Sequence, residues 1–258
     1  VDKAIEVMEK FVAQNPKNIE ARERLGQLYQ YAQRPDDYLA NLEEINKLRK
    51  SDDALRTMNE MYNAAQQYEK QEPALEALVG KDGEREPSQY RNLARLKSTQ
   101  QKLDEAVAVY QEFWNVHPDV FTFEDMEVMM TYQLELDDPE GAYQTAVRFT
   151  RGKEIDPKKV ARIINVLHYR GNVELAERFE EPYDANLKAY PDIAVEKVYL
   201  LLAKDDRAQA YEILKWLDAA VDLPVSLQRE YIGLLASNGE YEQAQERLEK
   251  LDFTAIQE

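Results

Sequence analysis

Apolar residues recur along the chain at positions i, i+1 and i+4, a spacing that places them on one face of an α-helix. Leu25, Gly26 and Tyr29 show the pattern near the N-terminus. The same pattern predicts amphipathic helices in segments 21–31, 90–100, 159–171 and 227–239. A second amphipathic stretch follows each of these segments, so the chain is predicted to consist of helical hairpins.

A small residue recurs at a fixed interval in the second helix of the predicted hairpins. Ala244, Ala210, Ala176 and Ala142 lie 34 residues apart. The register continues toward the N-terminus at intervals of 33 to 36 residues, through Ala106, Gln71, Tyr38 and Ala4. Because a small side chain lets two helices approach closely, we interpret the alanines as packing notches. A period of this length indicates stacked units that cannot bury their apolar faces alone.

The Leu-Gly-x-x-Tyr pattern at 25–29, the alanine in mid-unit and a proline near the end of the unit resemble the tetratricopeptide repeat (TPR), a helix–turn–helix unit of about 34 residues. The resemblance implies an all-α fold, an α-solenoid of about seven repeats wound as a right-handed superhelix, whose inner wall is lined by the first helices. The repeats are expected at 19–51, 52–86, 87–122, 123–156, 157–190, 191–224 and 225–258. They form a single array over 1–258, in which 1–18 supplies a partial repeat.

Turn-forming residues agree with this division. Gly171-Asn172 and Asn238-Gly239 fall between the two helices of a unit, where a glycine can end a helix. Prolines fall near the joints between units, at positions 16, 118, 157, 191 and 224. With only 8 Gly and 10 Pro in 258 residues, long helices with short joints are favoured over many strands.

Composition narrows the choice of partner. The chain has 33 Lys and Arg against 50 Asp and Glu, a net charge of −17, which disfavours nucleic acid and anionic membrane surfaces and favours a cationic partner. It contains no Cys, which excludes disulfides and thiolate metal sites. It has no run of 18 apolar residues, and it begins at Val1 without signal-peptide features, as an excised segment would.

The groove-facing positions of the TPR family, mapped onto this sequence, imply an acidic inner wall with amides and tyrosines between the carboxylates. The residues expected to bind a ligand there are Glu20, Glu23, Tyr31, Glu60, Asn63, Glu124, Glu127, Glu135, Asn165, His168, Tyr169 and Tyr199. Between Lys102 and Arg148 the chain has eleven acids and no Lys or Arg. We interpret this stretch as a block of unpaired negative charge that raises the local concentration of cations. The alternative interpretation is that these acids only solvate one edge of the fold.

Nothing in the sequence indicates an enzyme, a metal or a cofactor. His117 and His168 lack metal-ligand spacing, and the glycines of 80–83 lack the spacing of a phosphate-binding loop, so this irregular segment is interpreted as a joint. The adjacent acid pairs at 43–44, 137–138 and 180–181 diverge on a helix and are expected to be solvated. Aromatic and thioether side chains are expected in the core at Trp114, Trp216, Met126, Met129 and Met130.

A closer resemblance concerns the degenerate units 42–69, 84–113, 175–183 and 223–253. These segments resemble the periplasmic TPR scaffolds of bacterial exopolysaccharide export proteins, in particular those of the Pel system. The resemblance implies a non-catalytic scaffold that docks a periplasmic hydrolase/deacetylase and guides a cationic amino-sugar polysaccharide toward an outer-membrane porin. It also implies a periplasmic location, with membrane contact only through a barrel domain outside this segment.

Two alternatives remain open at this stage. The chain could be a peptide-docking TPR adaptor. Its acidic wall suits a basic partner segment, because the only residues that could clamp an acidic peptide are Asn63, Arg91 and Arg95. It could also regulate a partner enzyme through its outer surface, because a solenoid fold does not by itself specify function.

Overall fold

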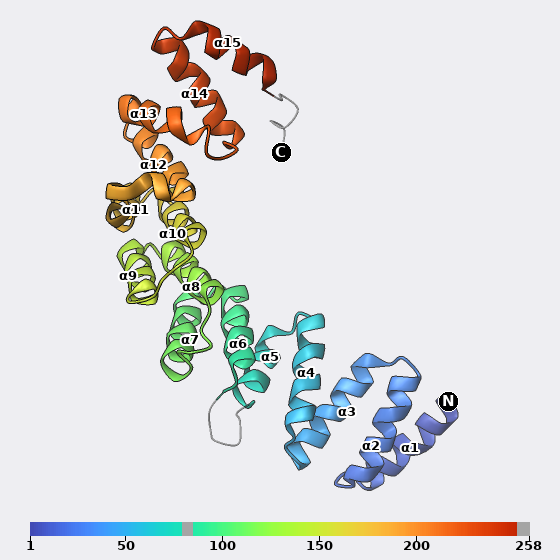
Figure 1. Ribbon diagram of the computed structural model, residues 1–258. Coiled ribbons are helices and arrows are strands. Elements are labelled where there is room, and N and C mark those ends of the chain that lie inside the picture. The colour runs from blue at the N-terminus through green and yellow to red at the C-terminus, as the bar shows by residue number, and fades with distance from the viewer. Residues whose placement is uncertain (79–84, 252–258) are drawn as a thin grey trace. The chain divides into compact units, whose positions relative to one another are not determined.

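The computed structural model describes residues 1–78 and 85–251, which are entirely helical apart from turns and loops (Figure 1). These residues form fifteen α-helices, one 3₁₀ helix and no strand. The helices are α1 (Asp2–Gln14), α2 (Ile19–Tyr31), α3 (Pro35–Leu48), α4 (Asp52–Ala64), α5 (Tyr68–Glu76), α6 (Pro87–Thr99), α7 (Leu103–Val116), α8 (Phe123–Glu135), α9 (Pro139–Thr150), α10 (Pro157–Tyr169), α11 (Val173–Glu180), η1 (Glu181–Ala189), α12 (Pro191–Ala203), α13 (Arg207–Leu217), α14 (Val225–Ser237) and α15 (Tyr241–Lys250).

Consecutive helices pair as hairpins. The even-numbered helices from α2 to α14 are the first helices of the repeats, and each packs against the helix that follows it. Second helices then contact the first helix of the next repeat, as α3 contacts α4 and α11 contacts α12. The protein is therefore an all-α, α-solenoid arrangement of TPR-like helix–turn–helix repeats, as the sequence predicts.

The chain divides into two compact units, residues 1–121 and residues 122–258. Unit 1 contains α1 to α7, and unit 2 contains α8 to α15. The division falls between α7 and α8, at the boundary between two of the expected repeats.

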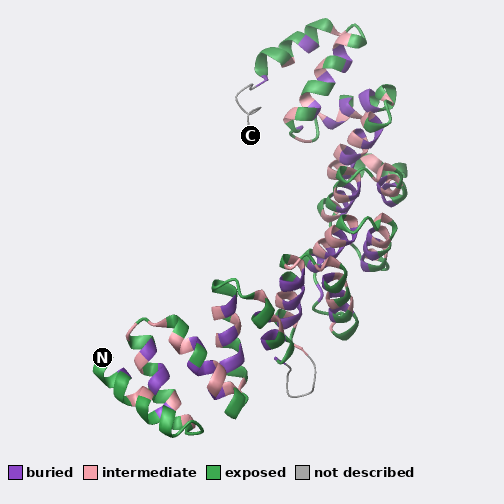
Figure 2. Ribbon diagram, turned by 180° about the vertical axis from the view of Figure 1, so that it is seen from behind, coloured by how far each residue is buried: buried purple, intermediate pink, exposed green. Residues whose placement is uncertain are grey.

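Most of the alanine register lies in the core, as predicted. Buried residues recur along the helices of both units (Figure 2). The alanines of the register that have no exposed surface are Ala106, Ala142, Ala176 and Ala210. Where the register departs from alanine, Gln71 is also buried and donates a hydrogen bond to Asn59 Oδ1 at 2.9 Å. Two members of the register differ: Tyr38 is only half-buried, and the side chain of Ala4 in α1 is exposed.

The other core predictions are confirmed for all but one residue. The three methionines of α8, at positions 126, 129 and 130, are buried. Trp114 is buried as well, and its ring stacks on Phe121 with centroids 4.8 Å apart. Trp216 is only half-buried, and it packs against the hydrophobic core that α12 to α15 share.

Every turn between the two helices of a repeat has the same backbone geometry. One residue with positive φ follows the first helix, and the N–H of the next residue bonds to a carbonyl five positions earlier, as Arg34 does to Tyr29 at 2.9 Å. The residues with positive φ in these turns are Gln33, Gln66, Gln101, Asp137, Gly171, Asp205 and Gly239. The two predicted glycine turns are therefore confirmed, and five turns use a non-glycine residue in the same place.

The prediction that the acid pair at 180–181 is solvated is wrong for Glu180, which has no exposed surface. The second helix of this repeat ends at Glu180, and η1 follows it directly. The Glu180 side chain contacts Lys197 of α12, whose Nζ lies 2.7 Å from Glu180 Oε2.

Within 1–78 and 85–251, no helix combines the length and the apolar character needed to cross a membrane. The glycine-containing segment 80–83, interpreted above as a joint, lies outside the described residues.

Candidate functional site

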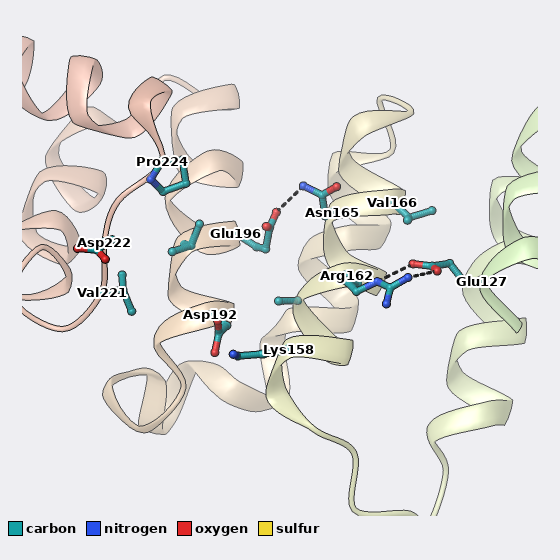
Figure 3. Close-up of a pocket in the computed structure, with 12 residues that line it drawn as sticks. Glu127, Lys158, Arg162, Asn165, Val166, Asp192, Glu196, Val221, Asp222 and Pro224 are labelled. Atoms are coloured by element: carbon teal, nitrogen blue, oxygen red, sulfur yellow. Dashed lines mark hydrogen bonds and ion pairs between the residues drawn. The ribbon is translucent and has the colours of Figure 1, made fainter. Parts of the chain in front are cut away.

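Unit 2 contains a groove of about 520 Å³ formed by α8, α10, α12 and the loop before α14 (Figure 3). We call it the acidic groove because it has four carboxylates and two cationic side chains. Its lining residues are Glu127, Lys158, Ala161, Arg162, Asn165, Val166, Asp192, Val195, Glu196, Val221, Asp222 and Pro224.

The 34-residue register positions these side chains. Asp192 stands 34 residues after Lys158, and Glu196 stands 34 residues after Arg162. Since α10 and α12 pack against each other, equivalent positions of the two helices lie on the same side of the repeat stack. The groove is therefore a consequence of the repeat, and its charge is decided by which residues occupy the equivalent positions.

Glu196 is the most buried carboxylate of the groove, with 9% of its surface exposed. Asn165 of α10 donates its side-chain amide to Glu196 Oε2 at 3.1 Å. Burial raises the pKa of Glu196, and the hydrogen bond from Asn165 opposes this rise. Among the described residues, no cation forms an ion pair with Glu196.

Glu127 is held by an arginine of the next repeat. Arg162 donates through Nε to Glu127 Oε1 at 3.0 Å and through Nη2 to Oε2. Such a two-point contact fixes both side chains more firmly than a single hydrogen bond. Glu127 is therefore neutralised at one end of the groove.

The prediction of an unpaired acidic block between Lys102 and Arg148 is wrong in part. Besides Glu127, Glu135 pairs with Arg170 at 3.2 Å, and Glu140 pairs with Arg178 at 3.3 Å. These partners lie in the following repeat, so the absence of basic residues along the sequence does not mean an absence of basic residues in space.

The predicted wall residues of α2 and α4 lie in unit 1. Glu20 pairs with Arg24 at 2.7 Å, Glu23 pairs with Arg49, and Tyr31 is exposed. The two predicted wall residues of α4, Glu60 and Asn63, are exposed.

One of these residues lines a second groove, of about 380 Å³, formed by α2, α3 and the start of α4. Glu23 contributes to it, together with Gln27, Gln30 and Asp53. Arg49, the partner of Glu23, also lines this groove, so the negative charge of the groove is partly compensated by one of its own lining residues.

The remaining predicted residues lie in unit 2. Glu127 and Asn165 line the acidic groove, whereas Glu124, Glu135 and Tyr169 do not and are exposed. A hydrogen bond from a backbone N–H lowers the pKa of Glu124 in the first turn of α8.

His168 and Tyr199 are half-buried neighbours, with ring centroids 6.5 Å apart. Burial lowers the pKa of His168. The Tyr199 hydroxyl lies 2.6 Å from Ser226 Oγ, which ties α12 to α14. Neither His168 nor Tyr199 lines the acidic groove.

Sequence reasoning missed Glu196 and Arg162 as groove residues. The signal was present, because both stand at the same register position on consecutive first helices. What the register could not reveal is that Glu196 lacks a cationic partner in the described part of the chain, while Arg162 has an anionic one.

The chemistry available in the groove is ionic and hydrogen-bonding. Among the described residues, no group of three or more His, Asp or Glu side chains is arranged to hold a metal ion. The groove offers carboxylates at Asp192, Glu196 and Asp222, an amide at Asn165 and apolar contacts at its walls.

The chain matches no family model and no curated protein. Among solved structures it is similar to the complex of Naa15 and Naa10 bound to HypK-THB, with a TM-score of 0.50 and 15% identity over 90% of this chain. It spans 36% of that chain. This likeness concerns the fold.

Two solved TPR proteins are also similar. One is from Parabacteroides merdae, with a TM-score of 0.43, 12% identity, and coverage of 90% of this chain and 91% of that one. The other is YrrB, described as a TPR protein with an unusual peptide-binding site, with a TM-score of 0.42, 14% identity, and coverage of 78% and 99%.

Proposed function

We propose that this chain is a non-catalytic TPR scaffold of an exopolysaccharide export system, and that its acidic groove binds a cationic amino-sugar polymer. The observation that carries the proposal is the charge of the groove. Once Arg162 has neutralised Glu127, three carboxylates remain against one lysine, Lys158.

The remaining features of the groove suit a sugar chain. Ammonium groups pair with carboxylates, hydroxyl groups bond to Asn165, and the apolar walls accept the faces of sugar rings. Exposed ion pairs contribute only about 0.2–1 kcal/mol each, so affinity comes from several contacts along a chain-like ligand. Because each contact is weak, a bound polymer can also leave the groove.

The resemblance to Pel-type scaffolds supports the export role in this proposal. In that role the chain lies in the periplasm and docks a polysaccharide hydrolase/deacetylase through a surface outside the groove. A purified enzyme of this class, mixed with the chain and analysed by size-exclusion chromatography, is expected to co-elute with it. Separate elution at micromolar concentrations would contradict the docking role.

Ligand binding is tested with glucosamine oligomers and their fully N-acetylated counterparts of equal length. By calorimetry, the deacetylated oligomer is expected to bind and the acetylated one is not. The double variant D192N/D222N is expected to weaken binding several-fold at low salt. The matched control E174Q/E242Q removes the same charge from exposed positions on α11 and α15 and is expected to bind as the wild type does.

In the alternative function, a different ligand binds in the same groove. A basic partner segment would present lysine or arginine side chains to the same carboxylates. If a lysine-rich peptide binds and the deacetylated oligomer does not, the chain is an adaptor for a basic protein segment, and the polysaccharide role is wrong.

A further inference from the structure

Glu196 differs from the other carboxylates of the acidic groove in its surroundings. It is nine-tenths buried, whereas Asp222 and Asp192 are more exposed. One carboxylate oxygen accepts the Asn165 amide at 3.1 Å, and the side chain extends into the space between α10 and α12 (Figure 3).

The two cations of the groove are directed elsewhere. Arg162 uses its Nε and Nη2 on Glu127, and the Lys158 side chain points toward Asp192 (Figure 3). Among the residues that the structure describes, Glu196 therefore has a hydrogen-bond donor but no counter-charge.

A buried carboxylate without a counter-charge is unfavourable unless it is protonated or meets a cation. Arg162 occupies the equivalent position one repeat earlier, but its guanidinium turns to Glu127 instead. Glu196 lines the groove, and its second carboxylate oxygen does not accept from Asn165, which fixes the orientation of the carboxylate through the other oxygen.

We infer that Glu196 is the recognition point of the acidic groove, where one primary ammonium group of a bound amino-sugar residue enters between α10 and α12 and pairs with this second oxygen. The inference rests on the proposed function and deepens it. Asn165 is a positioning residue, and Asp192 and Asp222 attract the polymer without selecting the site at which it docks.

Burial gives the contact a distinct salt dependence. Exposed pairs are screened at physiological ionic strength, where the Debye length is about 8 Å, whereas a desolvated pair is screened much less. Binding at Glu196 should therefore persist at moderate salt after the contribution of Asp192 and Asp222 has faded.

The test compares the wild type, E196Q and D192N/D222N in calorimetric titrations with a glucosamine oligomer at low and moderate salt. Glutamine keeps the size of the side chain and an oxygen for Asn165, so E196Q removes the charge with little change of shape. We expect E196Q to lose at least about tenfold in affinity at both salt concentrations. D192N/D222N is expected to lose affinity mainly at low salt.

A second measurement does not depend on a variant that folds. In the wild type, the ¹³C resonance of the Glu196 carboxyl group is expected to shift on addition of the deacetylated oligomer and to stay unchanged with the acetylated one. If the wild type binds the deacetylated oligomer and this resonance does not move, the inference is overturned and the proposed function stands. If E196Q and the wild type bind the deacetylated oligomer with equal affinity, the inference is likewise overturned and the proposed function stands. If the wild type binds neither oligomer, both are overturned.

Discussion

Lys197 of α12 donates a hydrogen bond to Glu180 Oε2 at 2.7 Å, and Glu180 has no exposed surface. The same ammonium group donates to Asp184 of η1 at 3.1 Å. One lysine thus holds the end of α11 and the following 3₁₀ helix against the next repeat.

The buried carboxyl group of Glu180 should make the stability of the protein depend on pH. Burial raises the pKa of Glu180 from 4.5 to about 7, although the hydrogen bond from Lys197 opposes this rise. Because the folded pKa lies above the unfolded one, the stability that Glu180 contributes is complete below pH 4.5 and is lost as the pH rises to about 7. Relative to E180Q, the wild type should lose free energy of unfolding over this interval. Urea denaturation of both proteins across the interval measures it, and parallel pH profiles would contradict it.

Removing the lysine should destabilise the protein strongly. K197M removes the ammonium partner of Glu180, and above pH 7, where this buried group is charged, breaking a buried pair costs about 3–5 kcal/mol. Lys204 pairs with Glu177 at 2.9 Å on the exposed surface, so K204M should cost no more than about 1 kcal/mol. Equal losses of stability in the two variants, measured by urea denaturation, would show that the burial of Glu180 is unimportant.

A carboxylate of unit 1 should have the opposite pH dependence. A hydrogen bond from Lys97 lowers the pKa of Glu72 to about 2, although burial opposes this. The folded pKa lies below the unfolded one, so the stability from Glu72 is present above pH 4.5 and is lost as the pH falls toward 2. E72Q should lose on the order of 2–3 kcal/mol at neutral pH and progressively less in acid. A loss that stays constant down to low pH would argue against this account.

Replacing a turn residue that has positive φ by glycine should stabilise the protein. Gln33 has φ of 55°, a conformation that costs an L-residue about 1–2 kcal/mol, while glycine adds flexibility worth about 0.5–1 kcal/mol to the unfolded chain. Q33G should therefore stabilise the protein by about 0.5–1 kcal/mol. The control Q27G places glycine within α2 and should destabilise by about 1 kcal/mol. The melting temperatures of the two variants should move in opposite directions.

The alanine notches should not tolerate larger side chains. Ala142 has no exposed surface, so A142L should overpack the contact between α8 and α9 and cost about 1–3 kcal/mol. Ala4 stands in the same register but is exposed on α1, and A4L should change stability by less than about 0.5 kcal/mol. Thermal or urea denaturation measures both, and similar effects of the two substitutions would contradict the notch interpretation.

Much of the fold could be predicted from the sequence because its determinants are local or periodic. The i, i+1, i+4 stripes, the alanine interval and the glycine turns each depend on residues within one repeat. The site was harder to predict. The register predicted Glu127 as a wall residue. It did not predict the ion pair of Glu127 with Arg162, because ion pairing depends on where flexible side chains reach between repeats.

The sequence by itself determined that the chain forms helical hairpins at a period near 34 residues, with small residues at the contacts and a strongly acidic composition. Only the tertiary structure decided which acids remain without a counter-charge. Helix periodicity follows from backbone geometry and apolar burial, which each repeat settles locally. Charge compensation is settled between repeats, where Arg162 turns to Glu127 and leaves Glu196 buried beside Asn165.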